Sequence, residues 1–197
     1  MPSDSGPKIR GAVIKDARNW MRTAYGPDAY KDALAALSSE ERGVVDGPIL
    51  TSEWYPLPAW DKLQAAMREQ AHARRGDSAF QFNMRNMREA GSTTVRRIYK
   101  FVLGLMSPLS VIEKGTIIYN RAYSEGRCDI VEKDSRRAVV RYSGASSAFR
   151  TSLINNFPSG LLFLLELNGA KNIDARISRD EIVDDKLVLE VTVLFDP

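Results

Sequence analysis

The spacing of hydrophobic residues changes near residue 127. Upstream, apolar residues recur every three or four positions, as Val13, Ala17 and Trp20 do, which is typical of one face of an amphipathic helix. Downstream, apolar and polar residues alternate, most clearly over 186–196, as in a strand with one buried face. The pattern therefore predicts a helical part followed by a part that contains a sheet.

The three- and four-residue spacing predicts a series of helices in the first part. Gly26 and Pro27 separate the first two, and Pro58 begins the fourth, since proline is well tolerated in a first helical turn. The predicted ranges are 9–25, 28–37, 39–47, 58–73, 78–90, 95–105 and 108–123. No segment before residue 127 has the pattern of a strand.

In the second part, two pairs of strands enclose a strongly apolar helix. Pro158 should interrupt or kink this helix, because proline lacks the N–H that a helix interior needs. The strands are predicted at 128–133, 137–143, 171–178 and 186–196, with the helix at 149–168. Short connections favour antiparallel pairing. We therefore predict an α+β fold, with an N-terminal layer of five to seven helices packed on a four-stranded antiparallel sheet of β-β-α-β-β order.

Composition agrees with a soluble globular protein. Apolar residues make up 44% of the chain and charged residues 27%, and the net charge is +3. Residues 1–7 are expected to form a mobile tail, and 8–197 a single domain. No secretion signal or membrane span is evident and the single cysteine suits a reducing compartment, so we expect a cytoplasmic protein.

Residues that often carry chemistry are scarce. His72, the only histidine, falls at the end of a predicted helix, and Cys128, the only cysteine, begins a strand. We interpret His72 as a helix-end residue and Cys128 as a small buried thiol, since neither has a predicted neighbour that would activate it. Phosphate-loop, zinc-protease and nucleophile-elbow motifs are absent from the sequence. Enzymes therefore rank third among the functions we consider, and no metal site is expected.

Two regions are candidates for binding a protein partner. The segment 68–100 carries eight lysines or arginines against three acids, which suits an acidic partner. The arginines assigned to this surface are Arg74, Arg75, Arg85 and Arg88. Trp54 and Tyr55 form an aromatic turn that could be an exposed anchor, although such clusters more often join a helix to the core. Nucleic acid is not an expected partner, because no reading motif accompanies the arginines.

The chain resembles an uncharacterised myxobacterial family of similar length. The residues behind this are GAVIKDARNWMRTAYG, LAALSSEER, GPILTSEWYP, IIYNRAYSEGRCDIVE and GLLFLLELNGAKNIDARIS. More distantly, the helix ending in Tyr25-Gly26 and the final β-β-α-β-β unit are similar to a ligand-binding superfamily. That superfamily is shared by haem nitric-oxide sensors, vinyl-reductase-like domains and Golgi-transport (TRAPP-type) subunits. The resemblance implies a pocket between helices and sheet.

The chain departs from the haem sensors where they hold their cofactor. Those sensors carry a proximal histidine on the helix ahead of the sheet, and the corresponding range 108–123 contains none. Their Tyr-x-Ser-x-Arg motif is also missing, because Ser143 and Gly144 follow Tyr142. We therefore expect no cofactor, and haem in particular is not expected.

Two hypotheses about function follow. The first is a non-enzymatic sensory or regulatory domain that binds a small apolar ligand between helices and sheet. The residues expected to line this pocket are Leu109, Ile112, Tyr119, Tyr142 and Phe163. The alternative is a protein-interaction or scaffolding module with a filled core. It would act through the arginine-rich helices or the Trp54-Tyr55-Pro56 turn, and a homodimer would be compatible with it.

Overall fold

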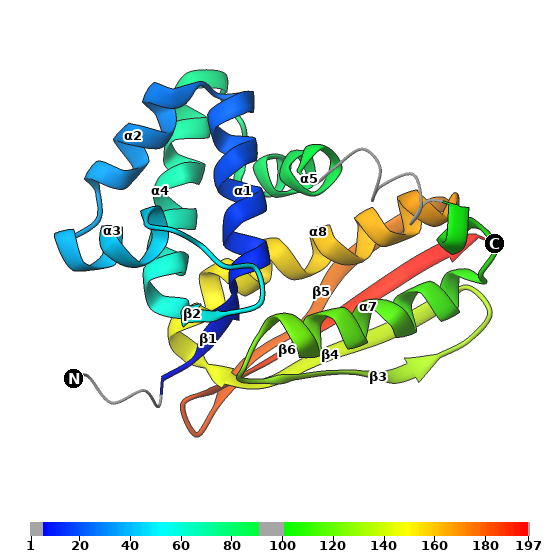
Figure 1. Cartoon of the computed structure of the whole chain (residues 1–197). Helices are drawn as coiled ribbons and strands as arrows, with labels where there is room; N and C mark the ends of the chain where they lie inside the picture. The colour runs from blue at the N-terminus through cyan, green and yellow to red at the C-terminus, as the bar shows by residue number, and fades with distance from the viewer. Residues whose placement is uncertain (1–5, 91–100, 197) are drawn as a thin grey trace. The chain divides into compact units, whose positions relative to one another are not determined.

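The change in hydrophobic spacing corresponds to a change of secondary structure in the computed structural model, which describes residues 6–90 and 101–196. The chain forms two compact units, each with dense contacts among its own residues. Unit 1 comprises the residues up to 90 together with 122–124, and unit 2 comprises 91–121 and everything from 125 onward. Unit 1 is largely helical and unit 2 contains the main sheet (Figure 1). The predicted α+β class is confirmed, while a single domain over 8–197 stays a prediction.

Unit 1 contains most of the predicted helices. They are α1 (Gly11–Ala24), α2 (Pro27–Ala35), α3 (Ser39–Asp46), α4 (Leu57–Arg75) and α5 (Ala79–Glu89). Ser38 and Ser78 each begin a capping box, in which a serine hydroxyl and a side chain three residues later satisfy the free N–H groups of α3 and α5. α4 ends at Gly76 with a φ of 71°, a left-handed conformation that glycine adopts without strain.

A small sheet in unit 1 was not predicted. Strands β1 (Lys8–Arg10) and β2 (Trp54–Pro56) pair antiparallel, with Ile9 opposite Tyr55. Ile9 also bridges to Tyr123, which attaches residues 122–124 to this unit. The expectation that no strand precedes residue 127 is therefore wrong. Three-residue strands are too short to show an alternating pattern, so sequence periodicity could not reveal them.

The sheet of unit 2 has the predicted number and order of strands. β3 (Arg127–Lys133), β4 (Arg137–Ser146), β5 (Lys171–Val183) and β6 (Lys186–Asp196) form an antiparallel sheet in the spatial order β3-β4-β6-β5. The odd-numbered residues 187–195 of β6 are buried, as their alternation indicated. β5 continues to Val183, so Asp180 and Glu181 belong to this strand and not to the expected loop.

Two helices accompany this sheet. α7 (Pro108–Ala122) precedes β3, and α8 (Arg150–Asn168) runs along β5 and β6 after the short 3-10 turn η1 (Ser147–Phe149) (Figure 1). α8 continues through Pro158, so the expected interruption is wrong, while the alternative of a kink stays a prediction. Side-chain hydroxyls bind the carbonyls near the proline, since Ser159 donates to Asn155 and Tyr119 to Asn156. Part of the helix predicted at 95–105 lies outside the described residues.

Candidate functional site

Three aromatic rings meet inside unit 2, and two of them belong to the predicted pocket. The ring centroids of Tyr119 on α7 and Tyr142 on β4 lie 6.5 Å apart. Phe157 on α8 packs edge-on against Tyr119 at 5.0 Å and lies 5.8 Å from Tyr142. All three side chains are buried. The cluster therefore joins both helices to the sheet.

The polar ends of these tyrosines are bound within the protein. The Tyr119 hydroxyl donates to the Asn156 carbonyl at 3.1 Å, and the Tyr142 hydroxyl donates to the Glu125 carbonyl at 2.8 Å. Gly160 lies so close to the Tyr119 hydroxyl that a methyl group at this position would overlap it. The interior of unit 2 is thus filled by its own side chains at the level of Tyr119.

The other three predicted lining residues lie on the same two helices. Ile112 on α7 is fully buried. Leu109 on α7 and Phe163 on α8 are half-buried. The structure therefore brings Tyr119 and Tyr142 together in one cluster, with the remaining residues elsewhere along α7 and α8. A lining role for all five stays a prediction.

Cys128 is buried, as the sequence indicated. The residue is only 1% exposed. Burial, with a smaller contribution from the charge of Asp129, raises the pKa of the thiol to about 12. The Asn120 side chain holds the backbone of Cys128, accepting from its N–H at 2.7 Å and donating to its carbonyl at 2.9 Å. A thiol that stays protonated is a poor nucleophile, so Cys128 is not a catalytic candidate.

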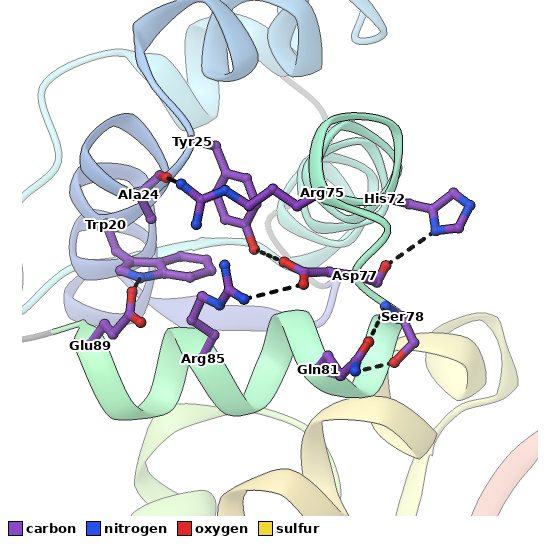
Figure 2. Close-up of polar contacts among 10 residues, drawn as sticks. All are labelled: Trp20, Ala24, Tyr25, His72, Arg75, Asp77, Ser78, Gln81, Arg85 and Glu89. Carbon is purple, nitrogen blue, oxygen red and sulfur yellow. Dashed lines mark hydrogen bonds and ion pairs between the residues drawn. The ribbon is translucent and has the colours of Figure 1, made fainter.

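Unit 1 contains a polar cluster around Asp77, in the turn between α4 and α5 (Figure 2). Asp77 is 8% exposed, accepts a hydrogen bond from the Tyr25 hydroxyl and pairs with Arg85 at 3.3 Å. Arg75 stacks 4.8 Å from the centre of the Tyr25 ring and donates to the Ala24 carbonyl. Burial, followed by the bond to Asp77, raises the pKa of Tyr25 above its usual value. The cluster links the end of α1 to the junction of α4 and α5.

Several residues of the predicted partner surfaces also make contacts within unit 1. Arg75 and Arg85 belong to the Asp77 cluster, and Arg74 pairs with Asp32 of α2 at 2.7 Å. Arg88 is exposed on α5. Trp54 and Tyr55 are both half-buried. The Arg10 guanidinium lies 3.9 Å from the Trp54 ring centre, and the Tyr55 hydroxyl accepts from the Leu50 N–H at 2.9 Å. Partner binding through these residues stays a prediction.

His72 lies in the last turn of α4, as predicted. Its imidazole is exposed, and the Nδ1 atom lies 3.3 Å from the Asp77 carbonyl oxygen (Figure 2). Within residues 6–90 and 101–196, no group of three histidine, cysteine, aspartate or glutamate side chains is arranged to hold a metal ion. In the same ranges, no helix is both long and apolar enough to cross a membrane.

Two asparagines on α5 are a feature that sequence reasoning missed. Asn83 is 1% exposed, and neither atom of its amide has a hydrogen-bond partner among the residues the structure describes. The Oδ1 atom of Asn86, one turn later, is buried and equally unpaired in the described chain. A signal was present, because Asn83 interrupts the apolar stripe formed by Phe80, Met84 and Met87.

Comparisons with known proteins bear on the fold. No protein-family model matches the sequence, and no curated protein matches it. Among solved structures, an oxygen-binding H-NOX domain related to soluble guanylate cyclases has a TM-score of 0.65 at 11% identity, over 96% of both chains. An Fe(II) unliganded H-NOX protein from K. algicida has a TM-score of 0.64 at 12% identity, over 96% of this chain and 97% of that one. A structure from work on heme distortion in the H-NOX family has a TM-score of 0.60 at 12% identity, over 96% of both chains.

This likeness covers both units, and at such low identity it establishes the fold. The resemblance to haem nitric-oxide sensors is confirmed at that level, whereas the myxobacterial family and the other superfamily members stay predictions. The likeness also overturns our expectation of no cofactor, because these neighbours are described with iron, oxygen or heme. We expected no haem because the proximal histidine and the Tyr-x-Ser-x-Arg motif are missing, but haem iron is also held by Cys, Met or Tyr in other proteins. A missing motif therefore does not decide cofactor binding.

Proposed function

We propose that this chain is a sensory or regulatory domain that binds a small molecule. The observation that carries the proposal is the match of nearly its whole length to H-NOX domains, one of which is described as oxygen-binding. A shared fold alone does not determine function, so the chemistry of the chain must agree with it. We further propose a non-enzymatic role, which is supported by the neutral thiol of Cys128 and the bound hydroxyls of Tyr119 and Tyr142.

The pocket that we propose lies in unit 2, towards Leu109, Ile112 and Phe163. Gly160 lies against Tyr119 and Gly115 against Leu164, so α7 and α8 run antiparallel. Continuing this register brings Ile112 and Phe163 within about one helical turn of the same level. Their apolar side chains support a ligand that is itself apolar. Tyr119 and Tyr142 would close one end of this pocket through their contact with Phe157.

The side chains that could coordinate iron determine how haem would be held. The Cys128 thiol is neutral, and both clustered tyrosines donate to backbone carbonyls. His72 fits better, because its Nδ1 atom faces the Asp77 carbonyl at 3.3 Å, which favours a proton on Nδ1 and leaves Nε2 as the ligating nitrogen. His72 is therefore the residue that would hold the iron. It is exposed and belongs to unit 1, so this haem site would be independent of the apolar pocket in unit 2. Bound haem would supply an iron centre able to bind a gas molecule.

Two measurements test the proposal. Native mass spectrometry of protein purified from its own cells should reveal a bound small molecule. Titrations with haemin and with lauric acid, followed by absorption and by melting temperature, should identify the ligand class. Absence of any bound molecule together with no response to either probe would contradict the proposal.

Matched variants separate the two ligand classes. Ile112→Phe should weaken lauric acid binding by filling the pocket, whereas Ile118→Phe on the exposed side of α7 should not. His72→Ala should weaken haemin binding, whereas Arg74→Ala, two residues later on α4, should not. A scaffolding module, the alternative, would instead bind neither probe and would lose its protein partner when Trp54 or the arginines are replaced.

A further inference from the structure

The α5 helix of unit 1 carries a buried amide group to which no described residue is hydrogen-bonded. Asn83 is 1% exposed, and both Oδ1 and Nδ2 are unpaired within the described chain. The two ends of an amide have nearly the same shape, and turning the Asn83 amide over would leave both its atoms unpaired among the described residues. The observation therefore does not depend on which way the amide points.

The neighbouring Asn86 adds a second polar atom. Residues three apart lie next to each other on a helix, so Asn83 and Asn86 share one face of α5. The Oδ1 atom of Asn86 is buried and has no partner among the described residues. This face thus presents one donor group and two acceptor atoms from two neighbouring side chains.

A role in helix capping does not explain these amides. The N-terminus of α5 is capped by Ser78 and Gln81, and its last turn is closed by the bond from the Ala90 N–H to the Asn86 carbonyl. The buried carboxylate of Asp77, in the same unit, is by contrast paired with Tyr25 and Arg85. Burying an amide without a partner costs free energy, so a folded protein normally supplies one.

We propose that Asn83 and Asn86 form a binding site for a neutral small molecule with an adjacent hydrogen-bond donor and acceptor, such as a cyclic amide. The Nδ2 atom of Asn83 donates to the ligand carbonyl, while the ligand N–H donates to the Oδ1 atoms of Asn83 and Asn86, which share it. A neutral ligand is favoured because these amides carry no charge with which to balance an ion. The site lies in unit 1 and does not depend on the apolar pocket of unit 2.

Two probes of nearly the same shape test this chemistry. 2-Pyrrolidone presents the N–H and carbonyl side by side, and N-methyl-2-pyrrolidone has lost the N–H. In a titration of the whole protein observed by NMR, 2-pyrrolidone should shift the side-chain amide signals of Asn83 and Asn86 in a saturable way. N-methyl-2-pyrrolidone should bind about tenfold more weakly, because one hydrogen bond is lost.

Variants on the same helix provide the controls. Asn83→Leu should abolish the response to 2-pyrrolidone, and Met87→Leu, which changes no polar group, should preserve it. The melting temperature of Asn83→Leu should be unchanged or raised, since no hydrogen bond among the described residues is removed. Asn83→Ala serves the same purpose if leucine prevents folding, and the two probes test the wild-type protein without any variant.

Three results would overturn the proposal. Equal binding of both probes would show that the amides do not recognise the ligand edge. Signals of Asn83 that do not respond to 2-pyrrolidone but show contact with a long-lived water would assign the site to a structural water. A lower melting temperature for Asn83→Leu would show that its amide has a partner inside the protein. None of these results concerns haemin or lauric acid, so the proposed function would stand or fall separately.

Discussion

Two asparagines, one in each unit, use their amide groups in opposite ways. Asn120 at the end of α7 binds both the N–H and the carbonyl of Cys128, at 2.7 and 2.9 Å. Asn83 on α5 is almost fully buried, yet neither of its amide atoms has a partner in the described chain. The first amide holds a strand to a helix. The amide of Asn83 lacks the stabilisation that a hydrogen bond would provide. Such a loss of stability is typical of residues that serve binding.

The same contrast extends to the surroundings of each residue. In unit 2, the rings of Tyr119, Tyr142 and Phe157 fill the space between helices and sheet, and both hydroxyls are bound to carbonyls. On α5, an apolar stripe is interrupted by polar side chains that remain unpaired in the described part of the protein. The contrast predicts that substitutions in unit 2 act mainly on stability and those at Asn83 mainly on binding.

Replacing Tyr142 by alanine should have the largest effect on stability. The side chain is 1% exposed, and removing a buried ring typically costs about 3–5 kcal/mol. Tyr142→Phe keeps the ring and loses the bond to Glu125, so it should cost about 1 kcal/mol. Urea unfolding measures both. If alanine costs no more than phenylalanine, the aromatic cluster does not support unit 2.

Asn120→Leu should be the next most destabilising change. It leaves the N–H and carbonyl of Cys128 without their side-chain partner, at a cost of about 2–3 kcal/mol. The same substitution at Asn83 should change the free energy of unfolding by less than about 1 kcal/mol, or raise it. Parallel urea titrations provide the comparison. Equal losses at the two positions would remove the distinction between a structural and a binding asparagine.

Asp77→Asn should destabilise unit 1 by about 2 kcal/mol, because charged hydrogen bonds to Tyr25 and Arg85 are weakened in a mostly buried site. Asp32→Asn is the matched control. Its ion pair with Arg74 is solvent-exposed and should contribute less than about 0.5 kcal/mol. Thermal unfolding at low and high salt measures both. If the two variants lose the same amount of stability, the Asp77 cluster does not hold the helices together.

The sequence predicted the elements whose evidence is local. The odd-numbered residues of β6 are buried as their alternation indicated, and α5 lies within the range 78–90 predicted for a helix. Helix periodicity was less reliable on α5, where Phe80 is 42% exposed and Phe82 is fully buried. Tertiary contacts decided that outcome, because Phe82 packs on Trp20 with 5.0 Å between ring centroids.

Features that depend on residues distant in sequence could not be predicted. Tyr25 and Asp77 are 52 positions apart, and no local pattern links them. The continuity of α8 through Pro158 depends partly on a hydroxyl from α7, that of Tyr119. The missing histidine motif was also a poor guide, since the chain keeps the H-NOX-like fold at 11% identity without it. Asn83 was the exception, because a polar residue within an apolar stripe is visible in the sequence.

Raising the pH from 9 to 10 should reveal the burial of Cys128 as a small loss of stability. Its pKa is raised from 9.0 to about 12 in the folded protein, so above pH 9 the unfolded chain releases a proton that the folded chain keeps. This stabilises the unfolded state, and the free energy of unfolding should fall by up to about 1.4 kcal/mol per pH unit as the pH rises from 9 towards 12.

Cys128→Ala isolates this contribution. The interval from pH 9 to pH 10 is the most informative, because Tyr25 and Tyr30, whose pKa values are also raised, add their own losses only above their ordinary value of 10.0. Urea unfolding across that interval should show a steeper decline for the wild type than for Cys128→Ala. Identical slopes would mean that the thiol ionises as readily in the folded protein as in the unfolded chain. The conclusion that Cys128 is tightly enclosed, in the strand that Asn120 binds, would then be wrong. The contrast between the two units would fail with it.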